Sequence, residues 1–574
     1  MSRLVNRRIR LLLATLIIAF AGLLLRAMWL QGVRAASLSR LGETQHREEV
    51  ALPASRGTIF DRMGVRLALG VQATTVYADP RQIRNPHAVA LAAGHALGLD
   101  PATLDAKLAD RTHGFVYLDR QADPNRAAAL QKLKLAGLGF YPEERRAYPQ
   151  GSVAAQVLGY VGVDDSGLAG LEFGLDRELA GRPGHETIVK DPTGRAIDVL
   201  SDRPAIPGRD VTVTIDHTIQ ANAEEALAQA VRKWNAKDAT ATVLDPRTGE
   251  ILAMAVEPGY DANAFPAARP DLQRNRTVTD TYEPGSTFKL VTVAAALSEH
   301  LVSPSTAFTL PYSIQVADRV IHDAEPRGTA RYSVAQILAH SSNVGAITLA
   351  EMLGRGRLSR WISHFGFGRR TGIDFPGESP GIVLPSQRWS GSTIGNVPIG
   401  QGIAVTPVQM AAAYAAIANR GVWVQPHLIA RIAGSTLPAL HRRRIVSRAV
   451  SAELMTMLED VVAEGTGTYA AIPGYVVAGK TGTAQKPDRS GGYAADKYVA
   501  SFVGLVPASR PRLVVLVTVD EPHGAIFGGV VAAPVFQQIA SFDLRYLEIP
   551  PDGPTLPSST AGTTTSTSVA ATAP

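Results

Sequence analysis

The sequence contains no cysteine, and this absence excludes disulfide bonds, thiol catalysis and cysteine-based zinc sites together. Lysine is scarce, because the 57 basic residues comprise ten lysines and forty-seven arginines. These basic residues and the 51 acidic residues are spread along the chain. The sequence therefore lacks the clusters of cations and aromatic residues that would indicate nucleic-acid binding. A lysine at a catalytic spacing is therefore more informative in this chain than in an average protein.

With 574 residues the chain is too long for one compact core, and about 100 to 200 residues per domain would allow roughly three to five units. The hydrophobic fraction of 45%, the charged fraction of 19% and the mean hydropathy of +0.04 are typical of a globular protein. They exclude a polytopic membrane protein, so we expect most of the chain to fold in water.

One long apolar run lies near the N-terminus, from Leu11 to Leu30. Its 20 residues match the roughly 30 Å thickness of a bilayer's hydrocarbon core, while Arg26 can snorkel to the interface and Trp29 suits a headgroup-level anchor. A cleaved signal peptide is the alternative, but no clean cleavage site of small residues follows, which favours an anchor. The positive-inside rule places the N-terminus in the cytoplasm, because four arginines precede the run: Arg3, Arg7, Arg8 and Arg10.

The chain divides into segments of different composition. A turn-rich junction near residue 205 separates a mixed region from a longer one, and the C-terminal end is rich in Ser, Thr, Pro and Ala with almost no hydrophobic residues. We predict a cytoplasmic tail over 1–10, an anchor over 11–30, an α+β pedestal over 40–205, one large α/β domain over 206–547 and a disordered tail over 548–574.

Residue patterns within these segments predict several elements. Helical character over 85–99 interrupts the pedestal's short β-like runs. At the start of the large domain we expect a strand over 209–216, a helix over 217–234 and a strand pair over 239–256, joined by a hairpin turn at DPRTGE.

Ser286 and Lys289 stand in the stretch TYEPGSTFKL, where Pro284-Gly285 indicates a turn and the following residues have helical character. Serine is a preferred N-cap, so a capped helix is one explanation. The functional explanation is that Lys289, one turn later on the same face, activates Ser286 as a nucleophile at a helix N-terminus that favours developing negative charge. Alone, this spacing does not decide between the two.

Two further polar clusters bear on that choice. Ser341-Ser342-Asn343 interrupts an otherwise helical segment, which indicates either a loop between two helices or a site. Lys480-Thr481-Gly482-Thr483 ends a β-rich stretch, and Gly482 would let another backbone approach closely. A strand running into a turn is the structural alternative there.

Together, Ser-x-x-Lys, Ser-x-Asn and Lys-Thr-Gly occur in the order that is typical of the penicillin-recognising serine acyltransferases. From the anchor to about residue 540 the chain resembles a class B penicillin-binding protein, of the FtsI-type division form rather than the elongation form. The resemblance also rests on RGTIFDRMG, YPQGSVAAQVLGYVG and GLAGLEFGLDRELAG in the pedestal and on FGFGRRTGIDFPGE, GQGIAVTPVQMAAAYAAIANRG and GGVVAAPVFQQI in the large domain.

The resemblance implies an α/β (α+β) serine transpeptidase fold. An antiparallel sheet flanked by helices, with an all-helical subregion, would follow a non-catalytic pedestal of the dimerisation type and a single transmembrane helix. It also implies a peptidoglycan D,D-transpeptidase that cross-links stem peptides during septal wall synthesis and needs no metal or organic cofactor.

The resemblance further implies a role for each motif residue. Ser286 would attack the penultimate D-Ala carbonyl of a D-Ala-D-Ala stem peptide, and β-lactam antibiotics would acylate it by the same route. Lys289 would be the base, with its pKa lowered by burial and a cationic neighbour. The implied catalytic residues are Ser286, Lys289, Ser341, Asn343 and Lys480; the implied substrate-binding residues are Thr481, Gly482 and Thr483, with the backbone N–H groups of Ser286 and Thr483 forming an oxyanion hole.

Location and partners also follow from the resemblance. The protein would be a single-pass protein of the bacterial inner membrane with its catalytic domain outside the cytoplasm. No glycosyltransferase region fits between anchor and large domain, so an FtsW-type membrane glycosyltransferase and other division proteins are the expected partners; nucleic acid is not.

Several alternatives compete with this interpretation. The protein could be an elongation-type or sporulation class B enzyme, or a D,D-carboxypeptidase that uses water as acceptor, which these residues alone do not distinguish. The anchor and pedestal argue against a β-lactamase. A β-lactam sensor should carry further membrane helices or a signalling domain, and an inactive scaffold should lack Ser286, Lys289 or Lys480, all of which are present.

Overall fold

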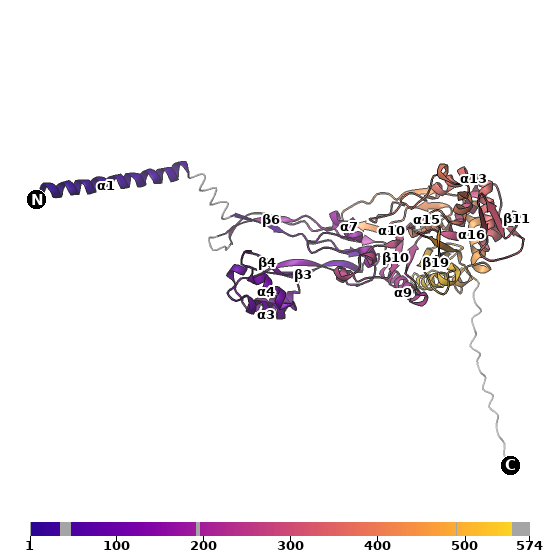
Figure 1. Cartoon of the computed structure of the whole chain (residues 1–574), viewed down its shortest axis with the longest axis horizontal. Coiled ribbons are helices and arrows are strands. Elements are labelled where there is room, and N and C mark those ends of the chain that lie inside the picture. The colour runs from indigo at the N-terminus through magenta and orange to yellow at the C-terminus, as the bar shows by residue number, and fades with distance from the viewer. Residues whose placement is uncertain (1, 35–46, 191–195, 489–490, 554–574) are drawn as a thin grey trace, which may run out of the picture. The chain divides into compact units, whose positions relative to one another are not determined.

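The computed structural model describes residues 2–34, 47–190, 196–488 and 491–553 (Figure 1). Contacts divide the chain into two units, of which the smaller combines 1–56 with 180–208 and the larger combines 57–179 with 209–574. Most of the predicted C-terminal tail, over 554–574, lies outside the described residues. All of the site residues predicted from the sequence belong to the larger unit.

The smaller unit contains a long apolar helix and a small sheet. Helix α1 (Ser2–Met28) continues into a π-helical turn, Trp29–Val33, and the two together include the whole predicted span and most of the predicted tail. The stretch Val5–Val33 is long and apolar enough to cross a membrane, and none of its most apolar window is buried within the protein. The sheet is antiparallel, in the order β1 (Arg47–Leu52), β6 (Gly184–Lys190) and β7 (Ala196–Arg203).

Residues 57–179 of the larger unit form an α+β region, as predicted. The helix expected over 85–99 is α3 (Pro86–Leu97): the Asn85 side chain accepts a hydrogen bond from the Ala88 amide, and Gly98 ends the helix with φ of 76°. The other elements are β2 (Ile59–Phe60), β3 (Arg66–Ala78), α4 (Pro101–Ala109), β4 (Val116–Ala122), α5 (Pro124–Lys132), β5 (Leu138–Ala147), α6 (Ala155–Leu158), α7 (Gly170–Gly174) and α8 (Asp176–Leu179).

One sheet joins this region to the segment that follows residue 208. Its strands run in the order β16 (Ile429–Ile432), β8 (Val211–Val213), β2, β3 and β4, and β5 also pairs with β3. The parallel pairing of β2 with β8 crosses the predicted boundary at 205, so the pedestal segment and the large domain share a sheet here.

The centre of the larger unit is a five-stranded antiparallel sheet with both faces buried. Along its middle strand, Val514 and Leu516 belong to one hydrophobic core and Val515 and Val517 to the other, because successive side chains of a strand point to opposite faces. The predicted strand pair is its β9–β10 hairpin. The strand order is β10 (Ile251–Glu257), β9 (Asp238–Leu244), β20 (Leu513–Asp520), β19 (Tyr493–Val506) and β18 (Ala478–Pro487).

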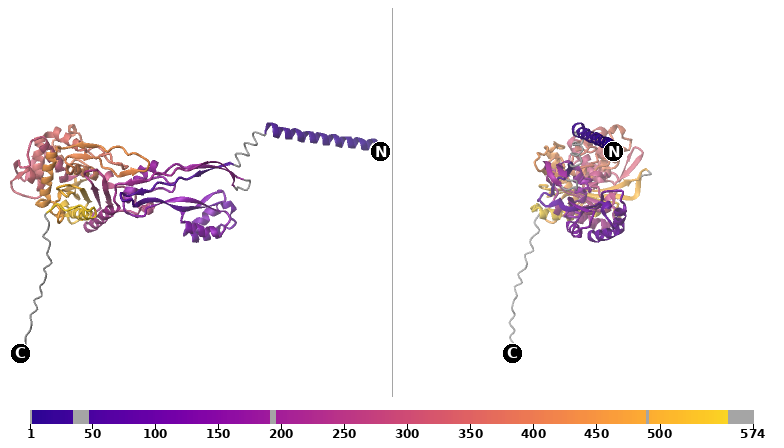
Figure 2. Two further views of the ribbon diagram at one scale, coloured as in Figure 1. Left: turned by 180° about the vertical axis from the view of Figure 1, so that it is seen from behind. Right: turned by 90° about the vertical axis from the view of Figure 1, so that its left-hand side faces the viewer.

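Helices cover both faces of this sheet. Helix α9 spans His217–Trp234, as the sequence predicted, and lies beside α18 (Ala533–Tyr546) on one face (Figures 1 and 2). The other face carries α11 (Lys289–Ser298) and α15 (Pro407–Ala418), whose residues are nearly all buried; a helix that is apolar all round belongs inside a core. The fold thus has the predicted sheet flanked by helices.

A helical subregion with three two-stranded sheets completes the larger unit. It positions the loop between α12 and α13 against α11. Its elements are β11 (Ala307–Leu310), β12 (Ser313–Val316), β13 (Arg319–His322), β14 (Ala330–Ser333), α12 (Val334–Ala339), α13 (Asn343–Phe365), β15 (Val422–Val424), β17 (Arg442–Arg444) and α16 (Arg448–Ala463), with the short helices α10 (Arg276–Thr279), α14 (Thr393–Asn396) and α17 (Gly528–Val531).

Candidate active site

Ser286 lies in a 3-10 turn, Gly285–Phe288, that leads directly into α11. The serine does not cap the helix, since neither the 3-10 turn nor α11 has a side-chain cap. Its Oγ instead accepts a hydrogen bond from Lys289 Nζ at 3.0 Å. Gly285 has φ of 55°, and a Cβ there would lie 2.9 Å from the Thr483 carbonyl oxygen, so the turn needs glycine to pack against β18.

Lys289 is fully buried, and its Nζ atom contacts residues of two motifs, Ser-x-x-Lys and Ser-x-Asn. Besides Ser286 Oγ, Nζ contacts Asn343 Oδ1 at 2.7 Å, Ser341 Oγ at 3.1 Å and the Ser341 carbonyl oxygen. Burial lowers the pKa of Lys289 to about 7, and the charge of Asp323 opposes this shift. Near neutral pH a substantial fraction of Lys289 is therefore uncharged and able to accept a proton.

The Ser341-Ser342-Asn343 run forms the connection between α12 and α13. Ser341 adopts φ of 56°, an unusual conformation for a residue with a side chain. Ser342 caps α13 by accepting a hydrogen bond from the Gly345 amide at 3.0 Å. The middle serine thus serves the helix, while Ser341 and Asn343 on either side of it reach Lys289.

Asp323 holds this connection in place and was not singled out from the sequence. Its carboxylate accepts hydrogen bonds from the Asn343 amide at 2.6 Å, the Val344 amide at 3.0 Å and Ser342 Oγ at 3.1 Å. It also accepts a hydrogen bond from Arg327 Nε at 2.8 Å. Asp323 lies twenty residues before Asn343, and only the tertiary structure brings them together, so no local spacing indicates this contact.

The Lys480-Thr481-Gly482-Thr483 run lies on β18. Lys480 is fully buried, and burial together with the charge of Lys289 lowers its pKa well below the usual value for lysine. The two buried lysines repel each other, so each is a cationic neighbour of the other, and burial is the main cause of the lowered pKa of Lys289. Lys480 Nζ donates to Thr481 Oγ1 at 3.2 Å, which orients that hydroxyl.

Gly482 brings β18 close to the nucleophile turn. A Cβ at this position would lie 2.3 Å from Ser501 Oγ and 2.9 Å from the Pro284 carbonyl oxygen, so only glycine fits. The close backbone approach expected from the sequence is therefore present. Thr483 Oγ1 accepts a hydrogen bond from the Gly528 amide at 3.1 Å, and Thr481 Oγ1 lies 2.6 Å from Thr466 Oγ1.

Strand β18 is the last strand of its sheet within the described part of the chain. One side of its backbone is consequently free of a neighbouring strand, and such an edge can pair with an extended peptide. The buried lysines lie behind a half-buried rim of Ser286, Ser341, Asn343 and Thr483. The arrangement suits a nucleophilic attack on a peptide laid along β18.

Comparisons with known proteins agree with this geometry. Residues 239–541 match the penicillin-binding protein transpeptidase domain, and residues 51–213 match the penicillin-binding protein dimerisation domain. The peptidoglycan D,D-transpeptidase FtsI of Escherichia coli K12 is 34% identical over 96% of this chain and 94% of its own length. The chain belongs to the class B penicillin-binding proteins.

Two further proteins extend the comparison. Stage V sporulation protein D of Bacillus subtilis is 33% identical over 95% of this chain and 87% of its own length. The crystal structure of penicillin-binding protein 3 from Mycobacterium tuberculosis in complex with aztreonam has a TM-score of 0.70 and 33% identity, and covers 88% of this chain and 99% of that one.

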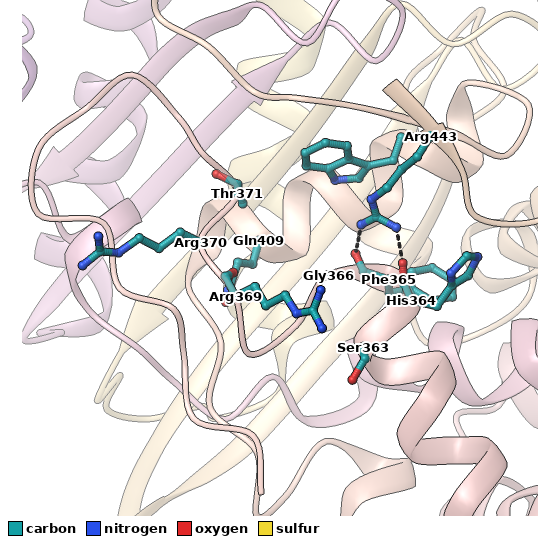
Figure 3. A pocket seen from close by; sticks show the side chains of 10 residues that line it. Ser363, His364, Phe365, Gly366, Arg369, Arg370, Thr371, Gln409 and Arg443 are labelled. Atoms are coloured by element: carbon teal, nitrogen blue, oxygen red, sulfur yellow. Dashed lines mark hydrogen bonds between the residues drawn. The ribbon is translucent and has the colours of Figure 1, made fainter. Parts of the chain in front are cut away.

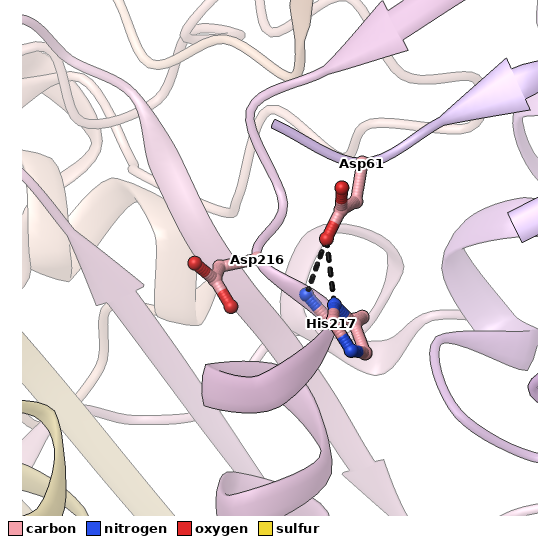
Figure 4. A group of neighbouring side chains, drawn as sticks. All are labelled: Asp61, Asp216 and His217. Atoms are coloured by element: carbon pink, nitrogen blue, oxygen red, sulfur yellow. Dashed lines mark hydrogen bonds and ion pairs between the residues drawn. The ribbon is translucent and has the colours of Figure 1, made fainter. Parts of the chain in front are cut away.

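A group of possible metal ligands lies elsewhere in this penicillin-binding protein, at the start of α9. Asp61, Asp216 and His217 offer ligand atoms within 4.8 Å of one another (Figure 4). Each carboxylate already has a role: Asp61 bonds His217 Nδ1 at 2.7 Å and the amides of Met63 and Val65, and Asp216 caps α9. The group therefore joins the β2–β3 turn to α9.

Proposed function

We propose that this class B penicillin-binding protein is a peptidoglycan D,D-transpeptidase that acts in septal wall synthesis through an acyl-enzyme at Ser286. Ser286 Oγ attacks the penultimate D-Ala carbonyl carbon and Lys289 takes the hydroxyl proton; this proton passes to the amide nitrogen as the C–N bond breaks, and the terminal D-Ala leaves as a free amine. The side-chain amine of a second stem peptide then attacks the ester carbon; a C–N bond forms, the C–O bond to Ser286 breaks, and a proton of the amine returns through Lys289 to Ser286 Oγ. The 3.0 Å contact between Ser286 Oγ and Lys289 Nζ carries this proposal.

Ser341 and Asn343 complete the proton path. With Lys289 uncharged, its lone pair can take the Ser286 proton, and Ser341 Oγ at 3.1 Å can relay it towards the leaving amine. Asn343 bonds Lys289 through Oδ1 and the His322 carbonyl through Nδ2 at 2.8 Å, so its amide is held in one orientation.

Strand β18 supplies the substrate-binding side. An extended stem peptide would pair with its free edge, and its terminal carboxylate would bind Thr481 and Thr483. Because a bound carboxylate favours the charged form of a nearby lysine, substrate binding would raise the lowered pKa of Lys480. Lys480 would supply positive potential to this carboxylate. The backbone N–H groups of Ser286 and Thr483 would stabilise the oxyanion.

The N-terminal helix supports a single-pass membrane anchor. We further propose that its N-terminus lies in the cytoplasm, because its arginines precede the apolar run. Proposed partners are an FtsW-type glycosyltransferase and other division proteins, which would contact the transmembrane helix and the pedestal segment 40–205. This segment precedes the proposed transpeptidase domain over 206–547.

Labelling of membranes with a fluorescent penicillin tests the catalytic assignment. Full-length protein should be labelled, Ser286→Ala should not, and Ser305→Ala should be labelled like the unchanged protein because Ser305 is an exposed loop serine. Incubation with a stem pentapeptide and a stem-peptide amine acceptor should give cross-linked dimers by mass spectrometry. Equal labelling of Ser286→Ala, or trimmed peptides without dimers, would contradict the transpeptidase proposal.

Replacement of residues 2–33 by an unrelated transmembrane helix of the same length tests the partner proposal. The variant should remain in the membrane and should still react with penicillin, but it should lose co-purification with the glycosyltransferase and fail to support division. Full support of division by this variant would exclude the helix as the contact surface.

A further inference from the structure

A hollow of about 320 Å³ lies at the C-terminal end of α13, and none of the proposed catalytic residues lines it (Figure 3). Three arginines and one histidine are among the residues that line it, and no acidic residue is. Its lining comprises Ser363, His364, Phe365, Gly366, Arg369, Arg370, Thr371, Gln409, Trp423 and Arg443. The chemistry of this wall is therefore cationic and rich in hydrogen-bond donors.

Arg443 forms a fixed part of the wall. Its guanidinium donates to the Phe365 carbonyl at 3.1 Å and to the His364 carbonyl, and it lies 4.9 Å from the centre of the Trp423 ring. A Cβ at Gly366 would lie 2.8 Å from an Arg443 nitrogen, so the glycine makes room for this group. Two of its five N–H groups serve the carbonyls, and the other three have no acceptor in the described part of the chain.

Arg369 brings a second cation to the same place. Figure 3 shows its guanidinium on the side of Gly366, below that of Arg443, whereas the guanidinium of Arg370 points away from both. Neither Arg369 nor Arg370 has a side-chain partner among the residues that the structure describes. The proximity of Arg369, together with burial, lowers the pKa of Arg443. Two like charges thus face each other, and no residue of the described ranges provides their counter-charge.

The acidic residues of the same loop do not neutralise this pair. Glu378 accepts hydrogen bonds from the Thr371 amide and hydroxyl at 2.6 Å and from the Gly372 amide at 3.1 Å. Asp374 accepts them from the Leu428 and Ile429 amides at 2.6 and 2.9 Å. Both carboxylates are committed to backbone groups, so an outside anion would be the counter-charge of the arginines.

We propose that this hollow is a binding site for a phosphate group, held between Arg369 and Arg443. Guanidinium groups match phosphate oxygens with paired, charge-assisted hydrogen bonds. A phosphate dianion would neutralise both facing charges, and the volume leaves room for the group that carries it. Arg443 could have a purely structural role, because it caps the carbonyl groups at the C-terminus of α13. Arg369 makes no such contact with the described residues, so a capping role does not account for its position.

Arg369→Gln and Arg370→Gln are a matched pair that tests the site in the full-length protein in detergent. Both remove one positive charge from adjacent exposed residues, but only Arg369 faces Arg443. Isothermal titration with inorganic phosphate, at constant ionic strength, should show saturable binding. Arg369→Gln should weaken it about tenfold, as the loss of one charge-assisted contact would, and Arg370→Gln less than about twofold.

Two further ligands distinguish a free phosphate ester from a lipid headgroup as the source of the phosphate group. Glycerol 3-phosphate represents a free phosphate ester, and vesicles containing phosphatidate represent a lipid headgroup; binding of either that is weakened by Arg369→Gln supports the site and identifies its source. The absence of saturable phosphate binding, equal weakening by the two variants or equal affinity for acetate would overturn the proposal. Penicillin labelling should be unchanged in both variants, so the result is independent of the proposed transpeptidase function.

Discussion

At the scale of single residues, the protonation of Lys289 should control acylation. Its pKa of about 7 predicts that the rate of acylation by a β-lactam rises with pH, is half-maximal near pH 7 and becomes constant above it, because only the uncharged amine accepts the Ser286 proton. Lys289→Arg should lower the rate about 10² to 10⁴-fold and remove the rise, since arginine stays charged. Stopped-flow acylation between pH 5.5 and 9 measures both; a flat profile in the unchanged protein would exclude Lys289 as the base.

Asp323 should matter as a positioning residue. Asp323→Asn would remove the counter-charge of Arg327 and would replace one acceptor oxygen by an NH2 donor, so the loop amides and Arg327 could no longer all be paired in a site where the carboxylate is only 8% exposed. We expect a loss of about 3 kcal/mol in the free energy of unfolding, which is the usual cost of breaking a buried ion pair, with slower acylation.

Chemical denaturation and acylation rates measure these two effects, and Asp318→Asn is the matched control. Asp318 is an exposed carboxylate in the preceding hairpin, so its substitution should change stability by less than about 0.5 kcal/mol. Equal behaviour of the two variants would show that Asp323 does not position the Asn343 loop.

At the scale of elements, the contact between β18 and the nucleophile turn depends on Gly482. In Gly482→Ala the added methyl group would collide with Ser501 Oγ and the Pro284 carbonyl, so β18 and Ser286 would move apart. We expect a loss of about 1 to 3 kcal/mol in stability and a large loss of acylation. Gly328→Ala is the control, because nothing lies within 4 Å of a Cβ there. Thermal unfolding and penicillin labelling separate the two effects; normal acylation of Gly482→Ala would contradict the tight packing.

Elements with local signals could be predicted from the sequence. Helix α9 has the predicted bounds, and the β9–β10 hairpin follows from DPRTGE, because capping and turn residues act on near neighbours. The break at Ser341-Ser342-Asn343 was also visible as polar residues within a helical stretch. The cap suggested for Ser286 was wrong, because its side chain faces Lys289 instead of the helix amides.

Other features depend on contacts between distant segments and had no local signal. Asp323 reaches the α13 N-terminus through a hairpin, and the pairing of β2 with β8 joins residues about 150 positions apart, as in Ile59 with Val211. The two facing arginines of the α13 hollow come from a loop and from β17. Sequence patterns report periodicity and nearby residues, so these juxtapositions required the fold.

At the scale of the whole molecule, anchoring and acylation should be separable. The apolar stretch Val5–Val33 belongs to the smaller unit, whereas Ser286, Lys289 and Lys480 belong to the larger one. Removal of residues 2–34 should therefore move the protein from the membrane fraction to the soluble fraction and leave the acylation rate within about twofold, since exposed changes far from a site have small effects.

Ultracentrifugation followed by penicillin labelling measures both properties, and Ser286→Ala in the shortened protein controls for non-specific labelling. A shortened protein that stays with the membrane would show that a second segment binds it. A soluble protein that reacts slowly would show instead that the helix acts on the catalytic site. The expected result, a soluble and fully reactive protein, would show that the apolar helix determines location and that the geometry around Lys289 does not depend on this helix.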